Sequence, residues 1–352
     1  MEKDQYYMKL ALQEAKKGRF QTWKNPMVGA VIVKNDQVLA TGHHIHYGKN
    51  HAERDAISKL TPEQLFNSTL YVTLEPCNHY GKQPPCSDLI VQSKIKHVVI
   101  AQVDPHKLVT GKGIAKLKAH GIEVTTGVLA KEAEELNRFY SYFYQNNRPW
   151  ITVKQAVSLD YRVNDQVNTR TAITNHSVYE RVHQERADYQ AILVGSNTAI
   201  IDNPSLLTTV QTDYPPIRII IDRRGRLLQH KDLKLLTDGQ AQTWIFTQNS
   251  ELKKNLTNNQ VKVWLMKTDQ LTEVIQTLAR EGIQSVYVEG GPTLANAFMN
   301  NQLVNKVIEY LSPQFLGKAG TAGILPSPRM ALKNLKIEQL SNNLRIAGEI
   351  DV

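Results

Sequence analysis

The stretch "EPCNHYGKQPPC", residues 75–86, contains both cysteines of a chain of 352 residues. Two cysteines separated by eight residues make a poor disulfide framework for a chain of this size. In a reducing compartment, such a pair more often binds a metal. Upstream, "HAE" at residues 51–53 places a histidine and a glutamate at the predicted start of a helix. The loop and the start of this helix together form a candidate metal site.

A histidine and two cysteines supply three ligands for a tetrahedral Zn²⁺ and leave the fourth position to water, which is typical of a catalytic zinc site. We expect His51, Cys77 and Cys86 to be these ligands, and Cys86 to open the helix that follows. Glu53 would move protons rather than bind the metal. The pattern matches the H-x-E and P-C signature of zinc deaminases, although the cysteine spacing here is C-x8-C. The structural alternative is two unrelated buried cysteines beside an ordinary helix cap.

The first 145 residues alternate helix-like and strand-like segments around these motifs. We expect Asp4 to cap a helix that ends near Gly18. The pattern is typical of a layered α/β domain with buried, partly parallel strands. Strands are predicted at residues 27–33, 37–42, 68–74, 97–103 and 121–128, and further helices at 87–95, 114–120 and up to about 144.

The segment "QNNRPW", residues 145–150, breaks this alternation, and the chain exceeds the size at which one core usually stops growing. We therefore predict two domains, residues 1–145 and 150–352. The second is again α/β. Its predicted strands are residues 151–159, 190–195, 217–222, 243–247, 261–266, 285–290 and 306–311, with helices at 176–186 and 269–281.

The composition is that of an ordinary globular protein, with 41% hydrophobic and 21% charged residues. Apolar runs such as "MVGAVIV" are far shorter than the roughly 18 residues of a membrane helix, and the N-terminus lacks a signal sequence. We expect a cytoplasmic protein that engages no membrane and forms a homo-oligomer. The net charge of +9 could attract nucleic acid and could equally attract a phosphorylated metabolite or NADPH, or it has no functional meaning. The sequence contains no basic block with interleaved aromatic residues, which is the pattern that would indicate a nucleic-acid partner.

The first domain resembles the deaminase domain of bifunctional riboflavin-biosynthesis deaminase/reductases. The resemblance rests on "HAE", "PCNHYGKQPPC", "NPMVGAVIV" (25–33) and "GHHIHYGKNHAE" (42–53), and continues through residues 103–124. It implies a cytidine-deaminase-like α/β/α domain that hydrolyses the 2-amino group of 2,5-diamino-6-ribosylamino-4(3H)-pyrimidinone 5′-phosphate. Asn25, His44 and His79 match family positions near the substrate. A nucleic-acid deaminase is a less favoured alternative, because those enzymes share "HAE" but have a shorter C-x-x-C.

The second domain is similar to the dihydrofolate-reductase-like α/β domain of the same family, which uses NADPH to reduce the ribosyl chain to ribityl. The matching stretches are residues 153–160, 186–206, 218–222, 288–299 and 312–317. Gly290 and Gly291 in "EGGPTL" would let the backbone approach phosphates at a helix N-terminus.

The resemblance also implies ligand-binding residues in the second domain. Arg186 could use its guanidinium fork for a phosphate or ribose oxygen. Carried over position by position, the NADPH site comprises Ala156, Thr198, Asp202, Gly291, Pro292, Thr293, Leu294, Ala295, Asn296 and Ala297, and the substrate contacts are Arg186, Leu206 and Glu289.

Five positions deviate from the reductase pattern. Tyr161 replaces a glycine, Arg170 a serine and Ala172 a tryptophan. Thr209 stands where an arginine is expected, and Arg223 replaces a small hydroxyl residue. A lost indole removes about 2–3 kcal/mol of apolar contact if it was fully buried. We therefore expect weakened reduction, with a second hypothesis that only the deaminase is active and the second domain serves as a scaffold.

Overall fold

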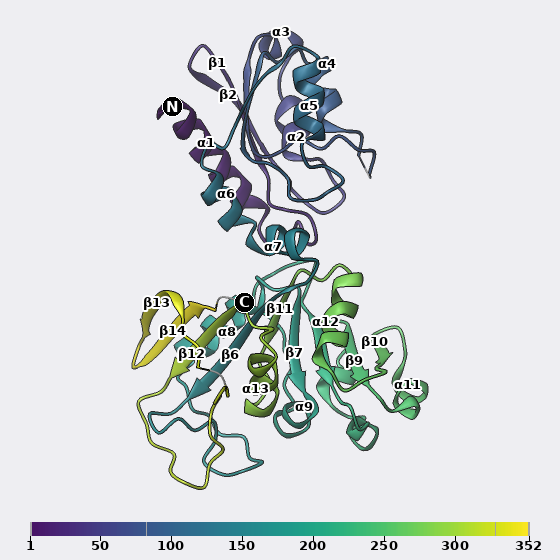
Figure 1. Ribbon diagram of the computed structural model, residues 1–352, viewed down its shortest axis with the longest axis vertical. Helices are drawn as coiled ribbons and strands as arrows, with labels where there is room; N and C mark the ends of the chain where they lie inside the picture. The colour runs from purple at the N-terminus through teal and green to yellow at the C-terminus, as the bar shows by residue number, and fades with distance from the viewer. Residues whose placement is uncertain (1, 82, 328, 351–352) are drawn as a thin grey trace. The chain divides into compact units, whose positions relative to one another are not determined.

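The computed structural model describes residues 2–81, 83–327 and 329–350. Two compact units make up the chain, residues 1–147 and residues 148–352 (Figure 1). Each is an α/β domain with its own sheet. No helix among the described residues is long and apolar enough to cross a membrane.

A five-stranded sheet forms the centre of the first unit, in the order β2-β1-β3-β4-β5. β1 pairs antiparallel with both neighbours, whereas β3, β4 and β5 run parallel. The mixed sheet confirms the prediction of partly parallel strands. The bounds are β1 Gly29–Lys34, β2 Gln37–His43, β3 Thr69–Leu74, β4 His97–Gln102 and β5 Glu123–Thr126.

Helices cover both faces of this sheet. Val31 and Val33 of β1 are buried in the same apolar cluster as residues of α1 (Glu2–Ala15) and α6 (Ala130–Leu136). Ala30 and Ile32, which point the other way, belong to a second cluster. The α/β/α layering predicted from the sequence is therefore confirmed. The second cluster includes residues of α2 (Ala52–Ile57), α3 (Pro62–Leu65), α4 (Cys86–Gln92) and α5 (Lys112–Ala119).

The predicted cap of the first helix was wrong, and the predicted last helix of this unit is divided in two. Asp4 lies within the first turn of α1 rather than at its cap, and its Oδ1 accepts a hydrogen bond of 3.0 Å from Tyr71 Oη. The last helix is divided into α6 and α7 (Arg138–Asn146) at Asn137. The Asn137 side chain bonds the backbone N–H and C=O of Met27, both at 2.8 Å. This long-range contact fixes the non-helical backbone of Asn137.

The second unit is built on a nine-stranded sheet in the order β10-β9-β8-β7-β11-β6-β12-β14-β13. In this spatial order, every strand from β10 at one edge to β12 runs parallel to its neighbours. The last two strands, β14 and β13, add an antiparallel edge. The strands are β6 Trp150–Val157, β7 Ala191–Gly195, β8 Ile217–Ile221, β9 Thr243–Thr247, β10 Val261–Leu265, β11 Ser285–Val288, β12 Lys306–Leu311, β13 Lys333–Leu340 and β14 Asn343–Glu349.

The helices of this unit pack on both sides of the sheet in Figure 1. The largest apolar cluster joins strand residues such as Leu193 and Phe246 to Val274 of α12 and Phe298 of α13. The predicted helix at 176–186 is confirmed as α8. The helices are α8 His176–Arg186, α9 Ser196–Asp202, α10 Lys234–Thr237, α11 Ser250–Leu256, α12 Leu271–Arg280 and α13 Pro292–Asn300.

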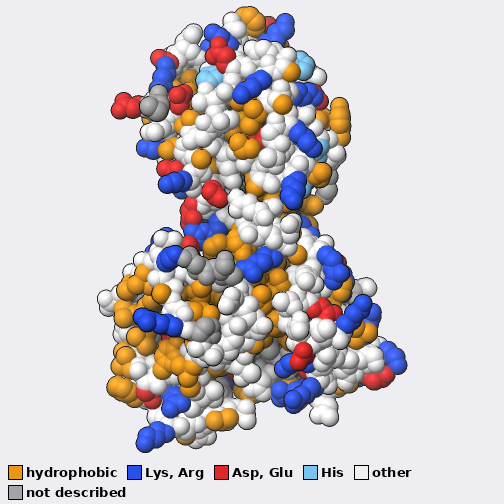
Figure 2. All heavy atoms as spheres, in the orientation of Figure 1, with side chains coloured by type: hydrophobic (Ala, Val, Ile, Leu, Met, Phe, Trp, Pro, Cys, Tyr) orange, Lys and Arg blue, Asp and Glu red, His pale blue; other side chains and the backbone are white. Residues whose placement is uncertain are grey.

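The hairpin of β13 and β14 was missed by the sequence analysis. Most side chains of β13 are exposed, and its apolar alternation is limited to Leu335 and Ile337 among charged and polar residues. Leu335 and Ile337 are among the exposed residues, and Figure 2 shows hydrophobic side chains on this side of the unit.

Candidate active sites

Three potential metal ligands converge in the first unit. His51 precedes α2 as its N-cap, Cys77 follows β3, and Cys86 is the first residue of α4. His51 Nδ1 lies 3.5 Å from Cys77 Sγ and 3.4 Å from Cys86 Sγ. Their ligand atoms all lie within 4.8 Å of one another, and no other His, Cys, Asp or Glu group of the described residues forms such a cluster. The donor set suits tetrahedral zinc with an open fourth position.

The beginning of α4 holds Cys77 in this cluster. The Cys86 backbone N–H donates to Cys77 Sγ at 3.4 Å, and the Ser87 N–H donates to the Cys77 carbonyl at 3.1 Å. The prediction that Cys86 opens a helix is confirmed. A side-chain hydrogen bond between the two cysteines lowers the pKa of Cys77 to about 4 despite burial, and the same side-chain bond together with burial raises the pKa of Cys86. A thiolate at Cys77 is the form that binds a metal.

Glu53 lies in the first turn of α2 and is 3% exposed. Burial raises its pKa to about 6, although the nearby His51 opposes the shift. The charge of Cys77 also raises this pKa, and a hydrogen bond with Cys86 lowers it. Both interactions show that the carboxyl borders the ligand cluster. A carboxyl with a pKa near the working pH can both accept and release a proton.

His44 and Asn25 form a second polar pair beside His51. His44 Nδ1 donates to the Asn50 carbonyl at 2.9 Å, so its Nε2 accepts from Asn25 Nδ2 at 3.0 Å. This contact turns the Asn25 amide nitrogen toward the histidine and leaves Asn25 Oδ1 as an acceptor. His44 therefore orients Asn25, and its ring lies edge-on to that of His51 with centroids 5.5 Å apart. His79 lies exposed in the 75–86 loop.

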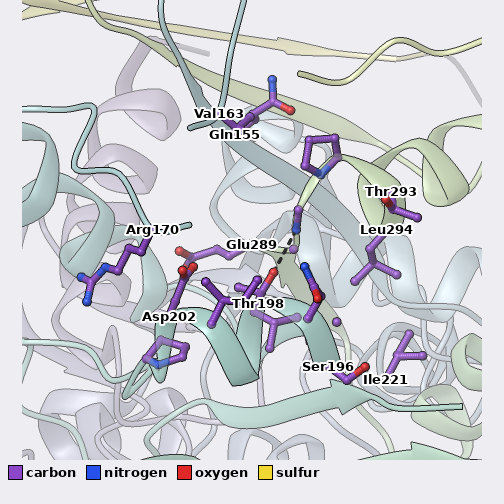
Figure 3. Close-up of a pocket in the computed structure, with 18 of the residues that line it drawn as sticks. Gln155, Val163, Arg170, Ser196, Thr198, Asp202, Ile221, Glu289, Thr293 and Leu294 are labelled. Carbon is purple, nitrogen blue, oxygen red and sulfur yellow. Dashed lines mark hydrogen bonds between the residues drawn. The ribbon is translucent and has the colours of Figure 1, made fainter. Parts of the chain in front are cut away.

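The second unit contains a cleft of about 1320 Å³ that is bordered by α8, α9 and the start of α13 (Figure 3). Ala295 and Asn296 lie outside it, because successive residues of α13 turn away from the cleft. Ala295 is buried in the apolar core, and Asn296 Oδ1 accepts from the Leu325 N–H at 2.8 Å. The other residues expected at the ligand sites all line the cleft: Ala156, Arg186, Thr198, Asp202, Leu206, Glu289, Gly291, Pro292, Thr293, Leu294 and Ala297.

A buried ion cluster lies in this cleft. Arg186 Nε and Nη2 contact Glu289 Oε1 and Oε2 at 2.6 and 3.0 Å, and Arg186 Nη1 donates to the Leu207 carbonyl at 2.9 Å. The guanidinium fork therefore binds Glu289, whereas the sequence suggested a contact with a phosphate or ribose oxygen. Lys154 Nζ lies 3.7 Å from Glu289 Oε2. Burial opposes ionisation of Glu289, but Arg186 and Lys154 outweigh it and hold the pKa of this carboxyl at about 2.

Lys154 was missed by the sequence analysis. It lies on β6 two residues before Ala156, and the period of a strand places both side chains on the same face. A charged residue at this position of a buried parallel strand was the signal that could have identified it.

The glycine turn before α13 packs closely against its surroundings. The Gly291 N–H donates to Thr198 Oγ1 at 3.2 Å, which is the dashed line in Figure 3. A Cβ on Gly290 would lie 2.7 Å from Leu294 Cδ2, so a larger residue would force the Leu294 side chain to shift. Asp202 lies nearby, and burial raises its pKa against the charges of Arg170 and Lys154.

The five deviating positions fall into two groups. Arg170, Ala172 and Arg223 line the cleft, whereas Tyr161 and Thr209 are not among its lining residues. Tyr161 adopts a left-handed backbone with φ of 59°, the strained conformation that its replacement of a glycine predicts. Burial and the neighbouring Glu309 raise the pKa of the Tyr161 hydroxyl to about 12.

Both units match known proteins. Residues 149–346 match the RibD C-terminal domain family, and residues 1–102 match the cytidine and deoxycytidylate deaminase zinc-binding region. Riboflavin biosynthesis protein RibD of Bacillus amyloliquefaciens is 42% identical over 320 residues, covering 89% of this chain and 85% of the relative. The Aquifex aeolicus RibD is 36% identical over 349 residues and covers 97% of each chain.

Solved structures agree with these matches. Acinetobacter baumannii RibD, form 1, has a TM-score of 0.91 at 33% identity and covers 100% of this chain and 99% of its own. The Thermotoga maritima diaminohydroxyphosphoribosylaminopyrimidine deaminase/5-amino-6-(5-phosphoribosylamino)uracil reductase has a TM-score of 0.88 at 32% identity, covering 99% of each chain. The chain therefore belongs to the family of bifunctional riboflavin-biosynthesis deaminase/reductases, with a zinc-binding, cytidine-deaminase-like domain followed by a dihydrofolate-reductase-like domain.

Proposed function

We propose that this chain removes the 2-amino group of 2,5-diamino-6-ribosylamino-4(3H)-pyrimidinone 5′-phosphate and then reduces the ribosyl chain of the product to ribityl with NADPH. The observation that carries the first step is the convergence of His51, Cys77 and Cys86 beside the buried Glu53. The reductase cleft of the second unit supports the second step.

In the deaminase site, His51 Nδ1 and the two sulfurs would hold Zn²⁺. When bound, zinc activates a water molecule for attack on the carbon that bears the amine. Glu53 takes a proton from this water and delivers it to the departing ammonia, and a pKa of about 6 suits both transfers. Asn25 Oδ1, fixed by His44, accepts a hydrogen bond from the substrate.

In the reductase site, Thr198, Asp202 and residues 291–294 would hold NADPH, which supplies the hydride. Gly291 lacks a side chain at the turn where the cofactor approaches. Lys154 and Glu289 face the same cleft and are suited to hydrogen-bond the oxygens of the ribosyl chain. Arg186 acts through Glu289, because its fork keeps that carboxylate ionised.

The deviating residues support slow reduction rather than its loss. Ala172 offers less apolar surface than an indole, and Arg170 and Arg223 add charge to the cleft wall. The cleft itself is retained, which favours an active reductase over a pure scaffold. A nucleic-acid deaminase is disfavoured, because it would leave a reductase domain of this size without a role.

The test is to assay each unit with its own substrate. Ammonia release is followed with the diaminopyrimidine, and NADPH oxidation is followed with the separately prepared deaminated product. We expect both activities, with reduction slower than deamination. Absence of NADPH binding at millimolar cofactor would support the scaffold hypothesis, and absence of ammonia release from zinc-loaded protein would refute the deaminase assignment.

A further inference from the structure

Glu75 is a buried carboxylate that the proposed reaction does not use. It follows β3, lies two residues before Cys77, and is 3% exposed. Its Oε1 accepts from the backbone N–H groups of Gly113 and Ile114 at 3.0 and 3.2 Å. Its Oε2 accepts from those of Gly111 and Asp104 at 2.9 and 3.3 Å. Both oxygens are thus filled by four backbone donors from residues 104–114, including the first turn of α5.

All four contacts are donated to Glu75, and a carboxylate accepts them through both of its oxygens. Hydrogen bonds from backbone N–H groups to a charged acceptor are stronger than those between neutral groups. The N-terminus of α5 also carries the positive end of the helix dipole. A glutamine in place of Glu75 would present one acceptor oxygen and one N–H₂ group, so its nitrogen would face backbone donors instead of accepting from them.

The same contact region holds the backbone that leads to Cys77. The Glu75 N–H donates to the Gln102 carbonyl at 2.9 Å, which ties it to β4. A Cβ on Gly113 would lie 2.0 Å from the Pro76 carbonyl oxygen, so the first turn of α5 packs directly on the residue before Cys77. The start of α4 holds Cys77 from another direction through the bonds of Cys86 and Ser87.

We propose that Glu75 is a positioning residue that fixes the place of the metal ligand Cys77. Its carboxylate sets the separation between Pro76 and α5, and thereby the direction in which Cys77 Sγ faces His51 and Cys86. The inference rests on the proposed zinc site. It predicts that loss of the carboxylate changes the metal site of a protein that remains folded.

The experiment compares Glu75→Gln with Gly113→Ala, which disturbs the same contact from the side of α5, and with Glu14→Gln as a matched control. Glu14 is another buried carboxylate of this unit, bonded to Lys17 and His43. Full-length zinc-loaded proteins are mixed with a chromophoric chelator, and the zinc release rate is measured. The Co²⁺-substituted proteins report ligand geometry through their visible and thiolate absorption bands.

We expect at least tenfold faster zinc release and shifted Co²⁺ bands in Glu75→Gln and Gly113→Ala, with wild-type values in Glu14→Gln. Far-ultraviolet circular dichroism of the full chain and the unfolding transition of the first unit should match wild type in all three variants, which reports that this unit is folded. If either site variant keeps this folded signature together with wild-type zinc release and Co²⁺ bands, Glu75 only stabilises the fold and the inference is wrong. Should Glu75→Gln not fold, Gly113→Ala decides alone.

Failure of the zinc site itself gives a different result. In that case wild-type protein would bind no stoichiometric zinc and release no ammonia, whatever residue occupies position 75. Stoichiometric zinc in wild type with unaltered release from the variants would instead retain the proposed function and overturn only the role of Glu75.

Discussion

Two buried glutamates show how local charge decides the chemistry of one residue type. Glu53 lies at the edge of two thiols and a histidine, and burial raises its pKa to about 6. Glu289 is also buried, but Arg186 and Lys154 hold its pKa at about 2. Glu53 is therefore suited to exchange a proton near neutral pH, whereas Glu289 remains a fixed negative charge.

Glu53→Gln tests proton transfer in the first unit. An amide of the same shape cannot carry the proton, so ammonia release should fall by a factor of about 10² or more. Zinc content, measured by metal analysis, should stay at the wild-type level. Retained zinc with nearly full turnover would assign the proton transfer to another group, and loss of zinc would make Glu53 structural.

Arg186→Met tests the buried ion pair of the second unit. The substitution removes the bidentate partner of Glu289 and leaves Lys154 at 3.7 Å, and breaking such a pair costs about 3–5 kcal/mol of the free energy of unfolding. Arg181→Met on the same helix removes a partly exposed pair with Glu338 and should cost less than about 1 kcal/mol. Denaturant unfolding measures both, and equal effects of the two variants would contradict the account.

The ionised Glu289 also predicts an acid dependence of stability. Its folded pKa of about 2 lies below the unfolded value of 4.5, so its contribution is complete above pH 4.5 and is lost as the pH falls toward 2. The free energy of unfolding of the second unit should therefore drop by about 2 kcal/mol more in wild type than in Glu289→Gln by pH 3. Identical pH profiles for the two proteins would show that Glu289 is not held ionised.

At the scale of elements, the sequence predicted segments with strong periodicity or capping signals. The strand at 217–222 appears as β8, and the helix at 176–186 as α8. The metal ligands were predicted from residue types and their positions, because two cysteines and a histidine are ligands that zinc favours. The break at Asn137 depends on a long-range contact, and the hairpin of β13 and β14 forms an exposed edge of the sheet. Hydrophobic periodicity indicates neither feature.

The same limit applies to the second site. The run from Gly291 to Ala297 matches the family, but helix geometry directs Ala295 and Asn296 out of the cleft. The fork of Arg186 was expected at a phosphate or ribose oxygen. In the structure it binds Glu289, and the sequence did not indicate this partner because residues distant in sequence leave no local pattern.

The loop that contains Ala172 provides a test at this scale. Ala172 lines the cleft and Tyr161 does not, so Ala172→Trp should raise NADPH affinity, by roughly 10-fold if the indole buries part of its surface against the cofactor. Tyr161→Gly should relieve the strained backbone without changing the dissociation constant. Titration of NADPH into each variant checks this. If Tyr161→Gly raised NADPH affinity and Ala172→Trp did not, the cofactor would not contact the Ala172 loop.

At the scale of the molecule, each proposed reaction has its own unit. The chain divides between residues 147 and 148, within the segment where the sequence pattern changes. The metal cluster comes entirely from the first unit and the cleft entirely from the second. Inactivation of one site should therefore leave the other reaction intact when each is supplied with its own substrate.

Removal of zinc tests this account most directly. The full chain is treated with a strong chelator, and ammonia release and NADPH oxidation are measured separately before treatment, after treatment and after zinc is restored. We predict that ammonia release is abolished and then recovered with zinc, whereas NADPH oxidation with the deaminated substrate is unchanged throughout. Metal-free protein that releases ammonia at the normal rate, or parallel loss of both activities, would contradict the account.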